Sequence, residues 1–262
     1  GTMAGLGEKA FETIDLVMKN LGLEVPEIGW GSSRDYFAEY VLMTGMVGAT
    51  LGKIANEIYQ LSRTEIRELQ EPLTKDYIGS STMPHKRNAE TSEFVVAISR
   101  IVINNCSLAL QSMISEHERD TRSWRLDWHT IPENSILVAK ILEDCKYVLD
   151  GLDINIRKIS ENLNLLKGML FSETIMLYLG KKVGKQTAHQ LIHDAIINAK
   201  DKDISFKNIL LNYKEIQKYI TEEELDNVMD YNKCVGKSED LVEKVIEKSR
   251  LLAKNDNEYL EF

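Results

Sequence analysis

The chain has 262 residues, 43% of them hydrophobic, and a formal net charge of −9 at pH 7. Its length and apolar content are enough for a sizeable core and exclude a disordered tail, while only 4 prolines and 15 glycines favour long helices over a β architecture with many turns. The negative charge excludes a nucleic-acid binder that relies on a general basic field.

Hydrophobic periodicity predicts four helices in the first part of the chain, at about residues 4–20, 35–69, 88–118 and 134–152. Shorter helical patterns follow at about residues 154–165, 171–182, 186–199, 203–218, 221–229 and 238–254. We therefore expect an all-α fold, with a long-helix bundle over residues 1–152 and a small C-terminal helical domain over residues 153–262.

Local signals set some of the expected helix ends. Ser33 is the expected N-cap of the first long helix, and TEEELD at 221–226 reads as a capped helix start. A polar break is expected at 117–133, HERDTRSWRLDWHTIPE. One stripe of apolar residues is expected to pack the first long helix into the bundle: Val47, Leu51, Ile54, Ile58 and Leu61.

The run from Phe94 to Ile114 is apolar on nearly every side. It also carries polar side chains that are costly in hydrocarbon, which argues against a membrane span: Arg100, Asn104, Asn105 and Gln111. We expect a helix that is surrounded by protein. Because one chain of this length can hardly wrap it completely, burial between subunits is expected.

The cysteines and histidines suggest no redox or metal chemistry. Cys106, Cys145 and Cys234 are odd in number and show no CxxC spacing, which fits a reducing cytoplasm better than a disulfide framework. No charged leader with an apolar core and a cleavage site appears at the start, so a cytoplasmic protein is expected. His189 and His193 have a spacing that could bind a metal, but without a third ligand we expect neither a metal nor a cofactor.

The stretch Gly79–Glu90, GSSTMPHKRNAE, separates two long predicted helices and is rich in groups that bind anions. Gly79 permits backbone angles that expose successive N–H groups, hydroxyls follow at 80–82, and Lys86 and Asn88 add a charge and an amide. Such groups can stabilise the negative charge that develops when the carbon next to a carboxylate loses a proton. By composition alone, a solvated linker is the commoner explanation.

The order of these residues resembles the signature loop of the fumarase/aspartase superfamily, G-S-S-x-M-P-x-K-x-N. The resemblance implies that Ser80 is the base that removes a proton β to the leaving group, and that Lys86 and Asn88 hold the substrate carboxylate as it becomes an aci-carboxylate dianion. It places further substrate contacts in the same loop, at Ser81, Thr82 and Met83. Glu93 is implied to orient a general-acid histidine, which lies outside this chain. One departure is Ala89, where the family usually has proline.

The segments 34–66 and 161–192 resemble both adenylosuccinate lyases and bacterial 3-carboxy-cis,cis-muconate cycloisomerases, so they do not separate the two branches. The arrangement Trp124-x-x-Asp-Trp128 does, because it resembles the cycloisomerase W-x-x-E-W. Adenylosuccinate lyases usually carry serine and arginine there, which serve the nucleotide phosphate. Trp30, in the segment before the first long helix, also fits the cycloisomerase pattern.

Arg34, Trp124 and Arg125 are therefore candidate substrate-binding residues. Each has a structural alternative. Indoles at i and i+4 near a helix start are more often core than ligand wall, and arginines next to acids often form structural salt bridges.

The resemblance covers essentially the whole chain and implies the C-terminal part of a longer enzyme. Such an enzyme is expected to be a homotetramer, with active sites shared between subunits and a small polycarboxylate as substrate, and with neither nucleic acid nor a membrane as partner. A cycloisomerase-like reaction is the first expectation and adenylosuccinate lyase the alternative. A second alternative is a non-catalytic helical scaffold, against which the intact Ser80, Lys86, Asn88 and Glu93 speak.

Overall fold

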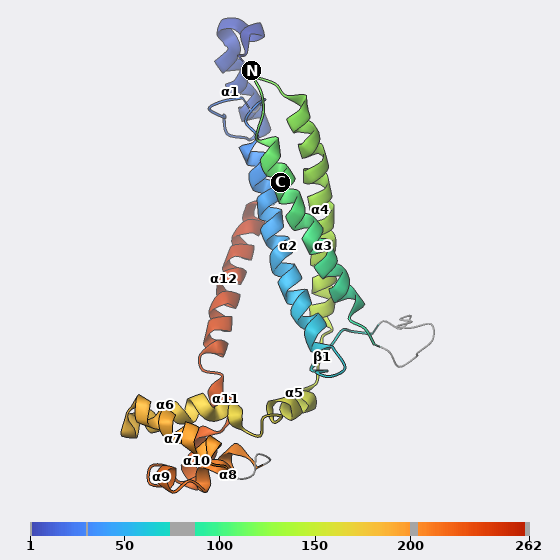
Figure 1. Cartoon of the computed structure of the whole chain (residues 1–262). Coiled ribbons are helices and arrows are strands. Elements are labelled where there is room, and N and C mark those ends of the chain that lie inside the picture. Colours follow the sequence, from blue (N-terminus) through green and yellow to red (C-terminus); the bar gives the residue numbers. More distant parts are fainter. Residues whose placement is uncertain (1, 30, 74–86, 200–203, 260–262) are drawn as a thin grey trace. The chain divides into compact units, whose positions relative to one another are not determined.

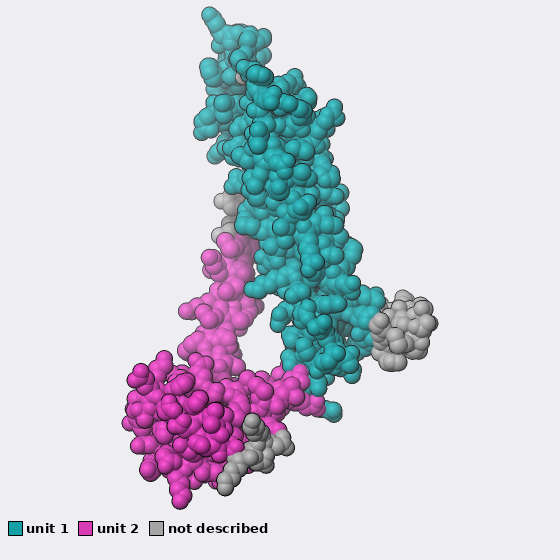
Figure 2. Space-filling model, in the orientation of Figure 1, with its two compact units in different colours: residues 1–158 teal, residues 159–262 magenta. Residues whose placement is uncertain are grey.

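The computed structural model describes residues 2–29, 31–73, 87–199 and 204–259, with side chains as far as residue 254. The chain divides into two compact units, residues 1–158 and 159–262 (Figure 2). The sequence pattern predicts a domain boundary a few residues earlier, after residue 152. Long bundled helices followed by smaller ones confirm the expected all-α fold class.

Unit 1 is built on three long helices that lie side by side in Figure 1: α2 (Asp35–Leu61), α3 (Glu90–Ser112) and α4 (Thr121–Asp150). A 3-10 helix (Ala4–Lys9) and α1 (Ala10–Leu21) precede them. Each long helix runs opposite to the one before it. The start of α2, the end of α3 and the start of α4 therefore share one end of the bundle, called here the Arg34 end. The start of α3 lies at the other end, called the Glu93 end.

Small residues dominate the face of α2 that is buried in the bundle. The buried face of α2 consists of Ala38, Val41, Gly45, Gly48, Gly52, Ala55 and Ile58. A Cβ atom on Gly48 would lie 2.9 Å from Cγ1 of Val102, so α2 and α3 approach more closely than a larger side chain would permit. The expected stripe of larger residues is only partly buried, since Ile58 is covered but Val47 is 38% exposed.

A polar network inside the bundle links all three long helices. The Asn105 side-chain amide donates to Oε2 of Glu133 at 2.7 Å and to Oδ1 of Asn134 at 2.9 Å. Asn134 in turn donates to Oγ1 of Thr44 at 3.1 Å. Because a buried amide without partners is costly, this network favours one register of α2, α3 and α4.

Two expected helix ends are wrong. The helix expected at 35–69 ends at Leu61, because the chain then turns and β1 (Leu69–Gln70) pairs antiparallel with β2 (Asp153–Ile154). The break expected at 117–133 is shorter, since α4 already begins at Thr121 and contains Pro132. Burial of one face of α4 outweighs the cost of a proline within the helix.

The expected cap at Ser33 is also wrong. Arg34 occupies the N-cap position of α2 and makes no side-chain capping bond, whereas the Ser33 hydroxyl donates to Oδ1 of Asp35 at 2.6 Å. The expected start at TEEELD is confirmed. Thr221 and Glu224 form a reciprocal capping box at the start of α10 (Glu222–Val228).

Unit 2 consists of short helices and one longer C-terminal helix: α5 (Ile156–Leu163, which crosses the unit boundary), a 3-10 turn (Met169–Phe171), α6 (Ser172–Val183), α7 (Lys185–Ile197), α8 (Phe206–Leu211), α9 (Lys214–Gln217), α10, α11 (Tyr231–Cys234) and α12 (Ser238–Tyr259). Phe206, Ile175 and Leu179 are central to its core. The Glu224 carboxylate accepts from Tyr178 and Lys182, and these bonds, with that from Thr221 N, lower the pKa of Glu224 to about 2.

Among the described helices, α3 is long and apolar enough to cross a membrane by length and composition alone. In this fold it packs against α2 and α4 and buries polar residues toward them, including Ser99 and Asn105. Buried hydroxyls and amides of this kind fit a helix that is covered by protein.

Candidate functional site

The predicted site residues fall at the two opposite ends of the bundle. Asn88 and Glu93 lie at the Glu93 end, just before and within the first turn of α3. Arg34, Trp124 and Arg125 lie at the Arg34 end. The remaining predicted residues fall outside the part of the chain that the structure describes: Ser80, Ser81, Thr82, Met83 and Lys86.

At the Glu93 end, protein groups hold the first turn of α3 in place. The Glu71 carboxylate accepts from the backbone N–H of Ser92 at 2.6 Å and from that of Thr91 at 3.2 Å. Arg87 donates to Oε1 of Gln70 at 2.6 Å and to the carbonyl oxygen of Glu71 at 3.3 Å. Sequence reasoning missed both Glu71 and Arg87.

A polar hollow of about 280 Å³ lies at this end. Asn88 and Glu93 both line it, together with Tyr59, Ser62, Arg63, Thr64, Arg87 and Ala89. The lining thus combines hydroxyls, an amide, two guanidinium groups and one carboxylate. Such a set of groups can bind an anion. The Glu93 side chain is exposed, so it can orient a group that another part of the protein supplies.

At the Arg34 end, Arg34 is held by the protein itself. Its Nε donates to Oδ2 of Asp127 at 2.7 Å and its Nη2 forms an ion pair with the same oxygen. The side chains of Arg34 and Asp127 are only 10% and 2% exposed. The Arg34 guanidinium also lies over the Phe37 ring, 4.1 Å from its centroid. The substrate-binding role of Arg34 stays a prediction, beside this structural role.

Trp124 ties the segment before α2 to the start of α4. Its indole Nε1 donates to the carbonyl oxygen of Gly31 at 3.1 Å. Arg119 lies over the indole, 4.9 Å from the ring centroid, and Arg125 lies 5.8 Å from the ring centroid of Trp128. Trp128 is 65% exposed, so this end presents an open surface of arginines and indoles.

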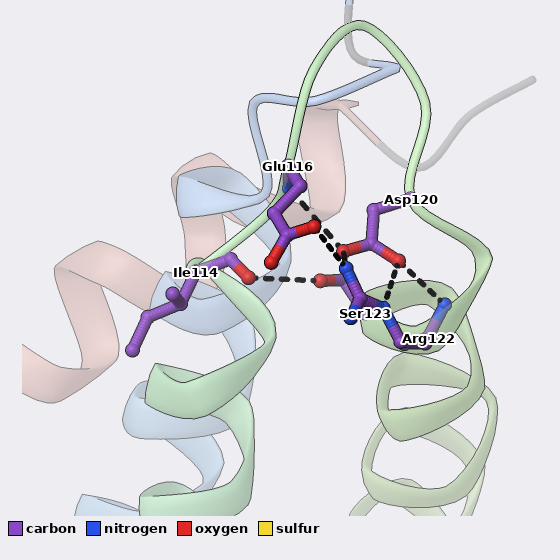
Figure 3. Close-up of polar contacts among 5 residues, drawn as sticks. All are labelled: Ile114, Glu116, Asp120, Arg122 and Ser123. Carbon is purple, nitrogen blue, oxygen red and sulfur yellow. Dashed lines mark hydrogen bonds and ion pairs between the residues drawn. The ribbon is translucent and has the colours of Figure 1, made fainter.

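Arg122, a further cation of this region, is already paired (Figure 3). The Asp120 carboxylate accepts from Nε and Nη2 of Arg122, each at 2.9 Å, and Glu116 forms an ion pair with Arg122 at 2.7 Å. The Arg122 side-chain bonds are the main cause that lowers the pKa of Asp120 to about 2. Asp120 also caps α4 through Arg122 N, a signal that the sequence carries as an aspartate directly before a helical pattern.

The two ends are too far apart to serve one small ligand within one chain. At about 1.5 Å per residue, the 23 residues of α3 span roughly 35 Å. The residues at the Arg34 end can therefore join Asn88 and Glu93 around a small substrate only if different copies of the chain supply them.

The described residues contain no group of three His, Cys, Asp or Glu side chains that could hold a metal ion. His189 and His193 line a hollow of about 350 Å³ between α6 and α7 in unit 2. The predicted site residues come from unit 1 alone.

Comparison with known proteins identifies the family. Residues 1–103 match the family model described as "Lyase", and residues 168–245 match "Adenylosuccinate lyase C-terminus". The N-acetyl-S-(2-succino)cysteine lyase of Dickeya dadantii is 39% identical over 246 residues, and the adenylosuccinate lyase of Pyrococcus horikoshii is 37% identical over 249 residues. These matches cover 94% of this chain but only 54% and 55% of the relatives, so the chain spans about half their length.

Among solved structures, the 3-carboxy-cis,cis-muconate lactonizing enzyme from Pseudomonas putida superposes with a TM-score of 0.84 at 27% identity. The superposition covers 97% of this chain and 56% of that one. The signature-like loop, the long-helix bundle and both family models agree with one another. The chain therefore belongs to the fumarase/aspartase superfamily.

Proposed function

We propose that this chain forms part of a lyase that eliminates fumarate from a small, phosphate-free succinyl compound, with N-acetyl-S-(2-succino)cysteine as the leading candidate. The observation that carries the reaction class is the pairing of Asn88 and Glu93 on one polar hollow at the start of α3, directly after the signature-like loop. The relative that acts on this thioether shares 39% identity across nearly the whole chain and supports the choice of substrate.

The proposed reaction needs a base, an acid and an anion site. Ser80 removes a proton from the succinyl CH2 group. This carbon lies β to the sulfur and next to the carboxylate that is farther from the C–S bond. Lys86 and Asn88 stabilise the resulting aci-carboxylate dianion. Collapse of the dianion forms the double bond of fumarate and breaks the C–S bond. A histidine oriented by Glu93 donates its own proton to the departing sulfur, so a free thiol is the second product while Ser80 holds the proton taken from carbon.

A cycloisomerase acting on 3-carboxy-cis,cis-muconate is the second candidate. It uses the same proton chemistry next to a carboxylate, and the Trp124-x-x-Asp-Trp128 pattern favours it. The structural likeness to the Pseudomonas putida lactonizing enzyme supports it as well. Asp127 is buried and paired with Arg34, so it does not contact a ligand in this arrangement. The groups of the pattern that could contact a ligand are the indoles of Trp124 and Trp128 and the guanidinium of Arg125.

Adenylosuccinate is the less suitable substrate, because a phosphate dianion needs several donors or cations. Trp124 and Trp128 replace the serine and arginine that would supply them. Arg122, which could compensate, is paired with Glu116 and Asp120. Arg119, over the Trp124 indole, and Arg125, next to Trp128, are the exposed cations of this segment for which no ion pair is seen among the described residues.

We expect the full-length enzyme to have a kcat/KM at least about tenfold higher on N-acetyl-S-(2-succino)cysteine than on adenylosuccinate, since one missing charge-assisted hydrogen bond costs about 1.5–3 kcal/mol. Trp124→Ser combined with Trp128→Arg should narrow this ratio by supplying phosphate ligands. Product formation is followed by ultraviolet absorbance of fumarate.

The matched control is Trp124→Phe with Trp128→Phe, which also removes the Trp124–Gly31 hydrogen bond but adds no donor. It should gain no adenylosuccinate activity. Efficient cleavage of adenylosuccinate by the wild type would contradict the choice of substrate, and lactonisation of carboxymuconate without thioether cleavage would favour the second candidate.

We further propose a homotetramer with sites shared between subunits. Besides its buried core, the bundle leaves large apolar side chains on its surface, including Met46 at 62% and Ile136 at 69% exposure. Exposed apolar faces of this extent are typical of protein interfaces. Light scattering of the full-length enzyme should give four times the subunit mass.

Ile136→Glu should shift the particle toward smaller species, because it places a charge in the proposed interface. Leu177→Glu is a matched control, since Leu177 is similarly exposed at 51% but belongs to α6 in unit 2. A folded wild-type monomer at micromolar concentration would contradict the shared site.

A further inference from the structure

Glu71 joins two parts of the chain that lie about twenty residues apart. Its carboxylate accepts hydrogen bonds from the backbone N–H groups of Thr91 and Ser92, in the first turn of α3. The first N–H groups of a helix have no partner within the helix and carry partial positive charge, so an anionic acceptor there is favourable. A carboxylate that accepts two such bonds fixes the position of the helix start more firmly than a single hydroxyl cap.

Arg87 makes a second link to the same residue. Its guanidinium reaches back to the backbone carbonyl of Glu71 and to the side chain of Gln70, which belongs to β1. β1 is in turn paired with β2, next to the end of α4. Residue 71 is thus bonded through its side chain to α3 and through its main chain to Arg87, the residue directly before Asn88.

The bonds made by Glu71 and Arg87 lie directly next to two of the residues that the proposed reaction uses, Asn88 and Glu93. Asn88 lies between Arg87 and the first turn of α3, and Glu93 follows Ser92 directly. Asn88 lines the hollow shared with Glu93 and also a neighbouring hollow of about 240 Å³ that includes Glu71. A shift of the α3 start would therefore move both Asn88 and Glu93.

We propose that Glu71 is a positioning residue for the elimination reaction, acting through the start of α3 on Asn88 and Glu93. This inference rests on the proposed function. Glu71 does not transfer a proton and does not contact the reacting atoms. Its carboxylate supplies the negative charge and the two acceptor oxygens that hold the start of α3, and the start of α3 sets the positions of the Asn88 and Glu93 side chains.

The test compares Glu71→Ala, Glu71→Gln and the wild type in the full-length enzyme with N-acetyl-S-(2-succino)cysteine. We expect Glu71→Ala to lower kcat at least about tenfold, because a displacement of about 1 Å at a site can cost up to a hundredfold. KM should change less than kcat, since Asn88 and Glu93 act on charge that develops in the transition state. Glu71→Gln keeps one acceptor oxygen and should recover part of the loss.

Amide hydrogen exchange at Thr91 and Ser92 gives a readout that does not depend on the substrate, and it should become faster in Glu71→Ala. Glu90→Ala is the matched control, because it removes an exposed acid from the same first turn without a capping bond to these amides. It should leave kcat and the exchange of both amides near wild-type values.

The outcomes separate this inference from the proposed function. If the wild type is active and Glu71→Ala turns over equally fast, or if Glu90→Ala loses as much, the positioning role is wrong while the proposed function stands. If the wild type cleaves none of the succinyl substrates, the proposed function fails and takes this inference with it.

Discussion

Replacing Ser80 by alanine should lower kcat of the full-length enzyme by at least about a hundredfold, because removal of a general base typically costs two to four orders of magnitude. Serine is a weak base unless its alkoxide is stabilised, and the Lys86 ammonium group with the backbone N–H groups of the loop offers that stabilisation. Substrate binding should change less, since the carboxylate contacts assigned to Lys86 and Asn88 remain.

The measurement is steady-state turnover, with circular dichroism to show that helix content is unchanged. Ser238→Ala is a suitable control, because Ser238 is an exposed serine at the start of α12 in unit 2, which supplies none of the predicted site residues. Its turnover should match the wild type. Full activity of Ser80→Ala would remove Ser80 from the mechanism and leave the signature-like loop as a binding element.

The helical architecture was predictable because it depends on periodic patterns. The all-α class and the capped start at Thr221 follow from residue order within a few turns of helix, and the structure confirms both. The wrong helix ends have non-local causes. The early end of α2 depends on a strand that pairs with residues 153–154, more than eighty positions away, and no local signal reports such a partner.

The site was predictable only in part, for a similar reason. The chemistry of the loop can be read from a short motif, but the supporting contacts cross long stretches of chain. Glu71 reaches Ser92, and Arg34 reaches Asp127, and neither pair has a spacing that marks it in the sequence. Arg34 precedes α2 and Glu93 lies in the first turn of α3. The starts of these two helices lie at opposite ends of the bundle only because of the folded path of α2 and α3 (Figure 1).

Because Arg34 and Asp127 form a buried ion pair, mutations of these two residues are expected to lower the stability of the fold. Only one Asp127 oxygen, Oδ2, is bonded to Arg34, and Oδ1 is buried without a hydrogen-bond partner among the described residues. The carboxylate therefore depends strongly on the guanidinium for compensation of its charge. Removing one member of a buried pair leaves the other charged group in a poorly solvated place.

We expect Asp127→Ala to lower the free energy of unfolding by about 3–5 kcal/mol, the usual cost of breaking a buried ion pair. Denaturant unfolding measures this at one fixed protein concentration, because assembly also contributes to stability. The control is Asp150→Ala, which breaks the exposed pair with Lys146 on the same helix, where the side chains are 75% and 64% exposed, and should cost no more than about 0.5 kcal/mol.

Arg34→Ala and the double variant decide whether Arg34 serves the fold, the substrate or both. A structural pair predicts that Arg34→Ala also destabilises and that the double variant loses less than the sum of the two single losses, since the buried charge has gone with its partner. A substrate role predicts in addition a higher KM for Arg34→Ala than for Asp127→Ala at equal folded fraction. If both single variants unfold like the wild type, the pair contributes nothing to the bundle, and the burial of its two side chains would need another explanation.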